Sequence, residues 1–233
     1  MVDMGRDGGV YLEAGSKRIF AAAIEWPGWC RSARDEEAAL AALGAYRERY
    51  AAVLTSAALE PADLPAERDL EVVERLQGGS GTDFGVPSVV PAADARPLTA
   101  AQADDLIRIL LACWEVFDAA ASEARGIELR KGPRGGGREL DAIVAHIDDA
   151  DLAYLKQLGS RGPARGLGVE EQREEVRRRA VAGVRARALG EDLEDARDTR
   201  KPWPPRYYLR RAAWHALDHA WEIEDRSRPD EQC

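Results

Sequence analysis

Two of the three histidines in this 233-residue chain, His215 and His219, lie four residues apart in the segment 214–224. Nothing in that segment breaks a helix, and helical residues four apart share a face. The third, His146, lies roughly seventy residues upstream, in a segment that also predicts a helix. If the two helices face each other, three imidazoles can meet. Three imidazoles suit a divalent first-row metal with a position open for water or substrate, so His146, His215 and His219 are predicted metal ligands.

The same spacing allows a plainer interpretation. Histidines on helices are often hydrogen-bonded in a core or exposed, and a single His-x-x-x-His pair is weak evidence for a metal. A metal-bound imidazole usually donates its other N–H to a carboxylate or carbonyl. Asp149, Asp218 and Glu222 are the carboxylates within reach on the two segments, and the sequence leaves open which of them serves.

Composition narrows the class of protein. A hydrophobic content of 45% supports a real core, and a formal net charge of -9 argues against a nucleic-acid or anionic-membrane surface. The three cysteines are far apart and form no Cys-x-x-Cys motif, which favours a reducing cytoplasm. No export signal or membrane-spanning run is expected. The expected partner is a small-molecule substrate or thiol, and a homodimer stays open.

The N-terminal part predicts a small antiparallel sheet with one helix. Strands are expected at 10–13 and 18–26, and a helix at 35–54 that opens on Asp35-Glu36-Glu37. Residues 60–97 are rich in proline and glycine. They could be a linker, or they could add two strands at 70–76 and 84–90.

Residues 9–58 resemble the HicB-like fold. The resemblance rests on the strand Phe20-Ala21-Ala22-Ala23-Ile24, the Trp26-Pro27-Gly28-Trp29-Cys30 turn, and the following acidic helix start. It implies a module that binds a protein or ligand. Such modules are usually joined to a DNA-binding segment, which this chain lacks, so an antitoxin role is not favoured.

The remainder predicts four helices. A Thr99-x-x-Gln102 capping box opens the first, the second contains His146, the third is the charged segment 169–189, and the last is expected at about 206–226. The expected architecture is therefore α+β, with an α/β module at 1–97 and a four-helix bundle at 98–233.

Residues 98–226 resemble the DinB superfamily of four-helix metal proteins. The resemblance rests on Gly137-Arg138-Glu139-Leu140 before His146, on Tyr154-Leu155-x-x-Leu158-Gly159 after it, and on the pair His215 and His219 in the last helix. It implies a divalent metal, zinc or nickel, held by these three histidines. Some relatives use a low-molecular-weight thiol such as mycothiol, which implies a metal-dependent S-transferase or hydrolase.

Two further features have alternative interpretations. The basic loop 130–138, with Arg134 and Arg138, enters a helix N-terminus and could bind an anion, although a flexible connection is the plainer interpretation. Trp214 and Trp221 could wall a pocket or simply pack. The competing function for the whole chain is a non-catalytic interaction protein or an antitoxin-like regulator, in which the N-terminal module binds a partner and the histidines are structural.

Overall fold

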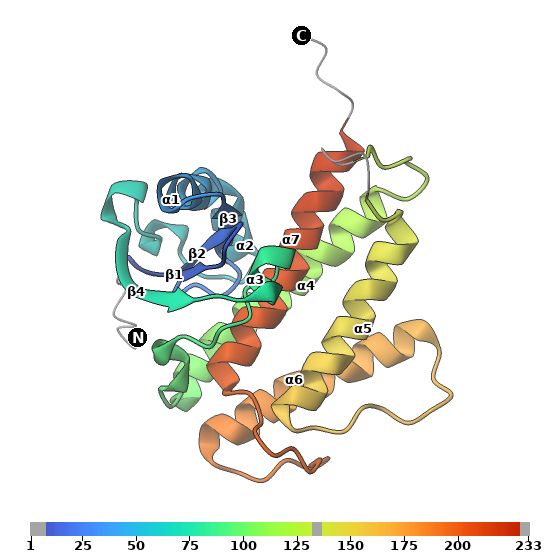
Figure 1. Cartoon of the computed structure of the whole chain (residues 1–233). Coiled ribbons are helices and arrows are strands. Elements are labelled where there is room, and N and C mark those ends of the chain that lie inside the picture. Colours follow the sequence, from blue (N-terminus) through green and yellow to red (C-terminus); the bar gives the residue numbers. More distant parts are fainter. Residues whose placement is uncertain (1–7, 132–136, 229–233) are drawn as a thin grey trace.

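The computed structural model describes residues 8–131 and 137–228, which have an α+β fold (Figure 1). Its N-terminal part contains a four-stranded sheet of order β3-β2-β1-β4. The strands are β1 (Gly9–Ala14), β2 (Ile19–Ala23), β3 (Cys30–Ala33) and β4 (Glu71–Gln77). The first three pair antiparallel, but β4 runs parallel to β1. The expected antiparallel sheet is therefore a mixed one, because the chain crosses over through helices before β4 and returns in the direction of β1.

The expected helix 35–54 is two helices. Asp35 caps α1 (Glu36–Ala45) by accepting a hydrogen bond from the backbone N–H of Ala38 at 2.8 Å. Tyr46 leaves helical geometry with φ -91° and ψ 3°, and α2 (Arg47–Ser56) follows. The break allows α1 to pack on β2 and β3 while α2 packs on a different partner, the later helix α4 (Ala100–Glu123).

The strand expected at 70–76 is confirmed as β4, whereas the strand expected at 84–90 is wrong. Phe84 ends the short helix α3 (Ser80–Phe84), and Gly85 follows with a φ of +115°. The backbone N–H groups of Ser88 and Val89 donate to the buried carboxylate of Glu13, at 2.9 and 3.0 Å. These donors are satisfied by a side chain, so the segment needs no neighbouring strand.

Four long helices make up the C-terminal part (Figure 1). They are α4, α5 (Leu140–Leu158), α6 (Val169–Leu189) and α7 (Pro205–Ser227). The predicted capping box is present, with Thr99 and Gln102 bonding each other's backbone N–H groups. Helix α7 packs against α4 and α5, and α6 packs against the same two helices and also touches α7. No helix in the described residues is both long enough and apolar enough to cross a bilayer.

The sheet is joined to α7 by a buried charged contact. Arg210, which is 5% exposed, donates to the Ala23 and Ile24 carbonyls at 2.7 Å each and pairs with Asp94 at 2.7 Å. Gly28, at φ +94°, lies so close to α7 that a Cβ there would be 2.8 Å from the Leu217 side chain. One cluster of buried hydrophobic residues therefore runs from β1 to α7.

Candidate metal centre

The three histidines lie together where α5 faces α7. The candidate ligand atoms of His146, His215 and His219 all lie within 4.8 Å of one another. His146 Nε2 and His215 Nε2 are 3.1 Å apart, and each of the three rings lies edge-on to the other two, with centroids 4.9–5.2 Å apart. His146 belongs to the second turn of α5, and the other two lie near the middle of α7. The juxtaposition expected from the spacing is thus present.

Glu222 fixes the orientation of the His219 ring. Its Oε2 lies 2.8 Å from His219 Nδ1, and its Oε1 accepts a hydrogen bond from Arg226 at 2.8 Å. An ionised carboxylate only accepts, so Nδ1 carries a proton, and Nε2 is the nitrogen left for a metal. The hydrogen bond from His219 is the main reason why the pKa of Glu222 is lowered. Of the three carboxylates considered from sequence, Glu222 therefore serves as the acceptor for one of the three imidazoles.

Burial keeps the other two imidazoles neutral. The pKa of His215 lies well below its usual 6.5, first because the ring is buried and then because His219, Arg211 and His146 would repel a second charge. Burial also lowers the pKa of the half-buried His146, followed by the effect of Arg138. Only a neutral imidazole has a lone pair for a metal, so both rings are in the ligating form near pH 7.

The remaining predicted carboxylates lie elsewhere. Asp218 pairs with Arg31 at 3.1 Å. Asp149 is exposed and makes no hydrogen bond to an imidazole in the described part of the chain, although its charge raises the pKa of His146. In the described residues, Nδ1 of His215 is buried without a partner. The carboxylate acceptors expected for His146 and His215 are therefore not in contact with these rings.

One pair of the three imidazoles has the spacing that a small divalent ion requires, whereas the widest separation in the set, up to 4.8 Å, would have to shorten for all three to bind one ion. Two nitrogens held about 2.0 Å from a tetrahedral zinc lie about 3.3 Å apart, close to the 3.1 Å between His146 Nε2 and His215 Nε2. A single proton shared between these nitrogens would give the same distance without a metal. The distance fits both interpretations, and metal content separates them.

The predicted anion loop is only partly described. Arg134 lies outside the described residues. Arg138 has an exposed side chain, and its carbonyl accepts a hydrogen bond from Arg226 at 2.9 Å. The N-cap of α5 is Glu139, which makes no side-chain capping bond. Arg138 lies near enough to lower the pKa values of His146 and His215, so its charge acts on the histidine centre.

Arg211 and Tyr154 adjoin the centre and were not identified as site residues from sequence. Arg211 is 6% exposed, donates to the Tyr154 hydroxyl at 2.8 Å, and lies 4.8 Å from the Trp214 ring centroid. The Tyr154 ring centroid is 5.8 Å from that of His215. Helical spacing could have identified Arg211 as a neighbour of the centre, because it lies one turn before His215 on the same face of the helix.

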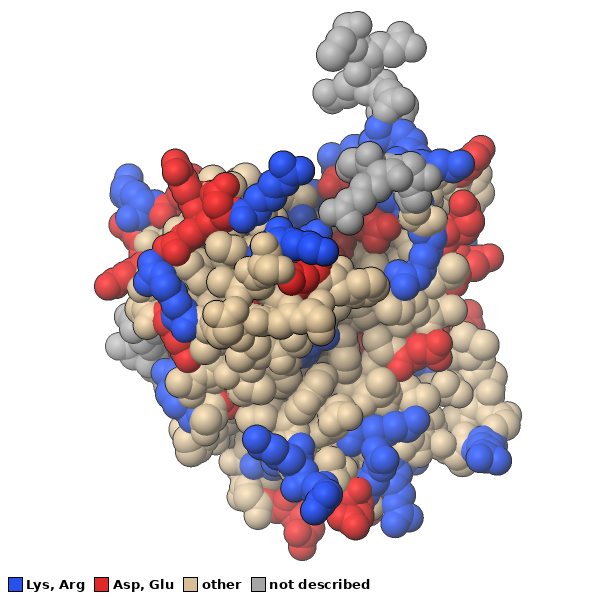
Figure 2. Space-filling model, viewed as in Figure 1, with Lys and Arg blue, Asp and Glu red and all other residues tan. Residues whose placement is uncertain are grey.

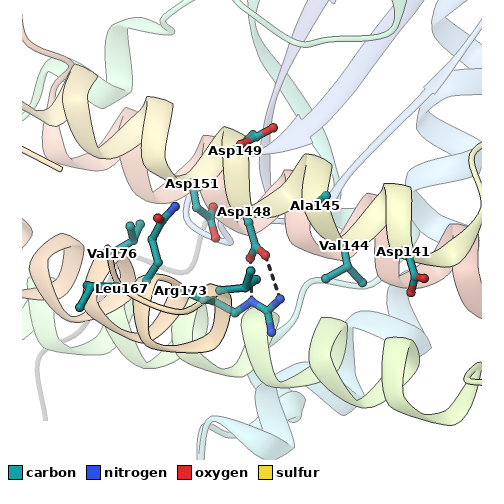
Figure 3. A pocket seen from close by; sticks show the side chains of 11 residues that line it. Asp141, Val144, Ala145, Asp148, Asp149, Asp151, Leu167, Arg173 and Val176 are labelled. Atoms are coloured by element: carbon teal, nitrogen blue, oxygen red, sulfur yellow. Dashed lines mark hydrogen bonds and ion pairs between the residues drawn. The ribbon is translucent and has the colours of Figure 1, made fainter. Parts of the chain in front are cut away.

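A separate cavity lies between α5 and α6 and contains no histidine (Figure 3). It has a volume of about 310 Å³, and Asp148 on its wall pairs with Arg173 at 2.6 Å. Figure 3 shows Asp149 on the other side of the α5 ribbon from this pair. The neighbouring Asp151 is buried, and burial raises the pKa of its carboxyl to about 7, against the opposing charge of Arg177. This cavity and the histidine centre are distinct.

The chain thus combines a mixed sheet, four long helices and a three-histidine centre between two of them. Comparisons with protein-family models, with curated proteins and with solved structures find no match.

Proposed function

We propose that this protein is a divalent-metal-dependent enzyme of the DinB-like class, in which α4 to α7 act as a four-helix bundle behind a HicB-like module. The observation that supports the proposal is the convergence of His146, His215 and His219 within 4.8 Å. Zinc or nickel is the proposed metal, since both accept imidazole ligands.

An enzyme needs a coordination position that substrate can reach. His215 and His219 are 6% and 9% exposed, whereas His146 is only half-buried. Three protein ligands would leave a fourth position free, and the partial exposure of His146 supports an opening on its side of the centre. This asymmetry favours a catalytic over a closed structural site.

The residues around the centre have separable roles. Glu222 holds the tautomer of His219, and Arg226 in turn holds Glu222. Arg211 opposes protonation of His215, and Arg138 opposes protonation of both His215 and His146. A divalent metal bound there would lower the pKa of a bound thiol or water and so supply a nucleophile at neutral pH. The proposed reaction class is S-transfer or hydrolysis, with a low-molecular-weight thiol as cosubstrate.

Cobalt(II) substitution tests whether a thiol reaches the metal. Titration of the cobalt-loaded protein with N-acetylcysteine should produce a thiolate-to-cobalt charge-transfer band, and His146→Ala should abolish it. A cobalt-loaded protein whose spectrum responds neither to the thiol nor to azide would have a closed site, which contradicts the enzymatic proposal.

We propose a cytoplasmic location on a separate observation. Cys30 and Cys113 are buried, unpaired thiols in the described part of the chain. Burial raises the pKa of both thiols above the usual range, so they stay protonated and inert. Free thiols of this kind are typical of a reducing compartment.

A further inference from the structure

A cavity of about 830 Å³ lies between the N-terminal part and α7, beside the metal centre. One wall comes from the sheet side, with Arg18, Arg31 and Ser32, and from Tyr46 between α1 and α2. The opposite wall is α7, and the loop after α4 completes the rim. Cavities of this size between structural units are typical sites for small organic ligands.

The charge of the lining differs from that of the whole protein. The chain carries a net charge of -9, and Figure 2 shows residues of both signs interspersed on the face drawn. The cavity instead has an excess of cations, five against three carboxylates: Arg18, Arg31, Arg130, Lys131 and Arg226 against Asp218, Glu222 and Asp225. Such a lining favours an anionic ligand.

The carboxylates in the cavity are already engaged. Asp218 pairs with Arg31, Glu222 with Arg226, and Asp225 with Arg49. By contrast, no carboxylate among the described residues pairs with Arg18, whose guanidinium donates to the Ser32 hydroxyl at 3.1 Å.

Lys131 is likewise without an acidic partner among the described residues, and it is exposed. Arg18 and Lys131 are therefore the cations of the lining that we expect to bind an anion. Tyr46 and Trp221, whose ring centroids are 4.9 Å apart, lie on the same lining, but the Arg31 guanidinium stands 3.9 Å from the Tyr46 ring centroid and Trp221 is 3% exposed. The charged groups therefore dominate the surface that a ligand would meet.

We propose that this cavity binds a small organic anion, its anionic group held by Arg18 and Lys131. The same cavity is lined by Glu222, whose carboxylate bonds His219. A ligand there lies one side chain away from the histidine centre. If the bound anion is the substrate, this inference rests on the proposed function. Binding of an anion to the cavity does not depend on it.

The test uses 2-naphthoate and its neutral counterpart 2-naphthamide, titrated calorimetrically into the full-length protein stripped of metal with EDTA. Stripping prevents the carboxylate from binding a metal directly. Naphthoate should bind, and naphthamide should bind at least about ten-fold more weakly, since its neutral amide forms no charged hydrogen bond with the two cations.

Variants assign the site. Arg18→Gln and Lys131→Gln should each weaken naphthoate binding about ten-fold, whereas Arg125→Gln, an exposed arginine outside the lining, should leave it unchanged. Lys131 is exposed, so its variant is expected to fold even if Arg18→Gln does not. Equal affinity for the two probes, equal losses in the control, or no binding would overturn the proposal.

Repeating the titration after zinc loading separates the two proposals. Naphthoate binding by a protein that takes up no zinc would support the anion site while removing the proposed metal enzyme. Zinc uptake without naphthoate binding to the stripped protein would leave the metal centre in place and overturn the anion site.

Discussion

Replacement of Asp151 by asparagine should change how stability depends on pH. Asp151 lies in α5, is 3% exposed, and approaches Arg177 only to 4.0 Å, too far for a hydrogen bond. Burial raises the pKa of its carboxyl from 3.8 in the unfolded chain to about 7 in the folded protein. The native state therefore holds a proton that the unfolded state has lost over this range.

The sign follows from proton linkage. Because the folded protein binds the extra proton, the stability present below the unfolded pKa of 3.8 is lost as the pH rises toward the folded pKa of about 7. One pKa unit corresponds to about 1.4 kcal/mol, so the whole loss is about 4 kcal/mol. About 2 kcal/mol of it falls between about pH 5.5 and about pH 8. Asparagine does not titrate, so the Asp151→Asn variant does not lose this stability as the pH rises.

Urea unfolding of the metal-free protein measures the effect. The free energy of unfolding of Asp151→Asn, relative to the unsubstituted protein, should rise by about 2 kcal/mol between about pH 5.5 and about pH 8. Asp149→Asn, an exposed residue on the same helix, should show no such rise. Arg177 keeps its ion pair with Asp118 in the variant, so no new unpaired charge confuses the comparison. Parallel pH profiles for all three proteins would refute the reasoning.

Three further substitutions test the site and its support. Glu222→Gln keeps the shape of the carboxylate but removes the charge that orients His219, so zinc affinity in a competition titration should fall about 10- to 100-fold; unchanged affinity would exclude that role. Arg210→Leu leaves the carboxylate of Asp94 buried and unpaired, so urea unfolding should show a loss of about 3–5 kcal/mol. A loss below about 1 kcal/mol would mean that this contact does not hold the sheet on α7. Gly28→Ala forces a methyl group against Leu217 at a positive φ, which should cost about 1–3 kcal/mol of unfolding free energy. The melting temperature should therefore fall by several degrees.

The long helices and the histidine pair could be predicted because their signals are local. The Thr99 capping box, the apolar spacing behind it and the His215/His219 register each depend on a few neighbouring residues. His146 meets that pair only if α5 faces α7. From the sequence, this packing could only be stated as a condition, and the structure has it.

Other features depend on contacts distant in sequence. The segment 84–90 has strand-like residues, but its backbone donors go to Glu13, about 75 residues upstream. The parallel pairing of β4 and the break at Tyr46 are likewise set by what the elements pack against. Among three carboxylates of similar spacing, only side-chain geometry singles out Glu222, since Asp218 turns toward Arg31.

Metal content of the purified, untagged protein tests the central claim most directly. Elemental mass spectrometry should find about one equivalent of zinc or nickel per chain. His146→Ala and His219→Ala should each lose it, while Asp149→Ala, which changes an exposed neighbour that does not contact the imidazoles, should retain it. No uptake from any divalent ion offered, or full retention in both histidine variants, would contradict a shared three-histidine site.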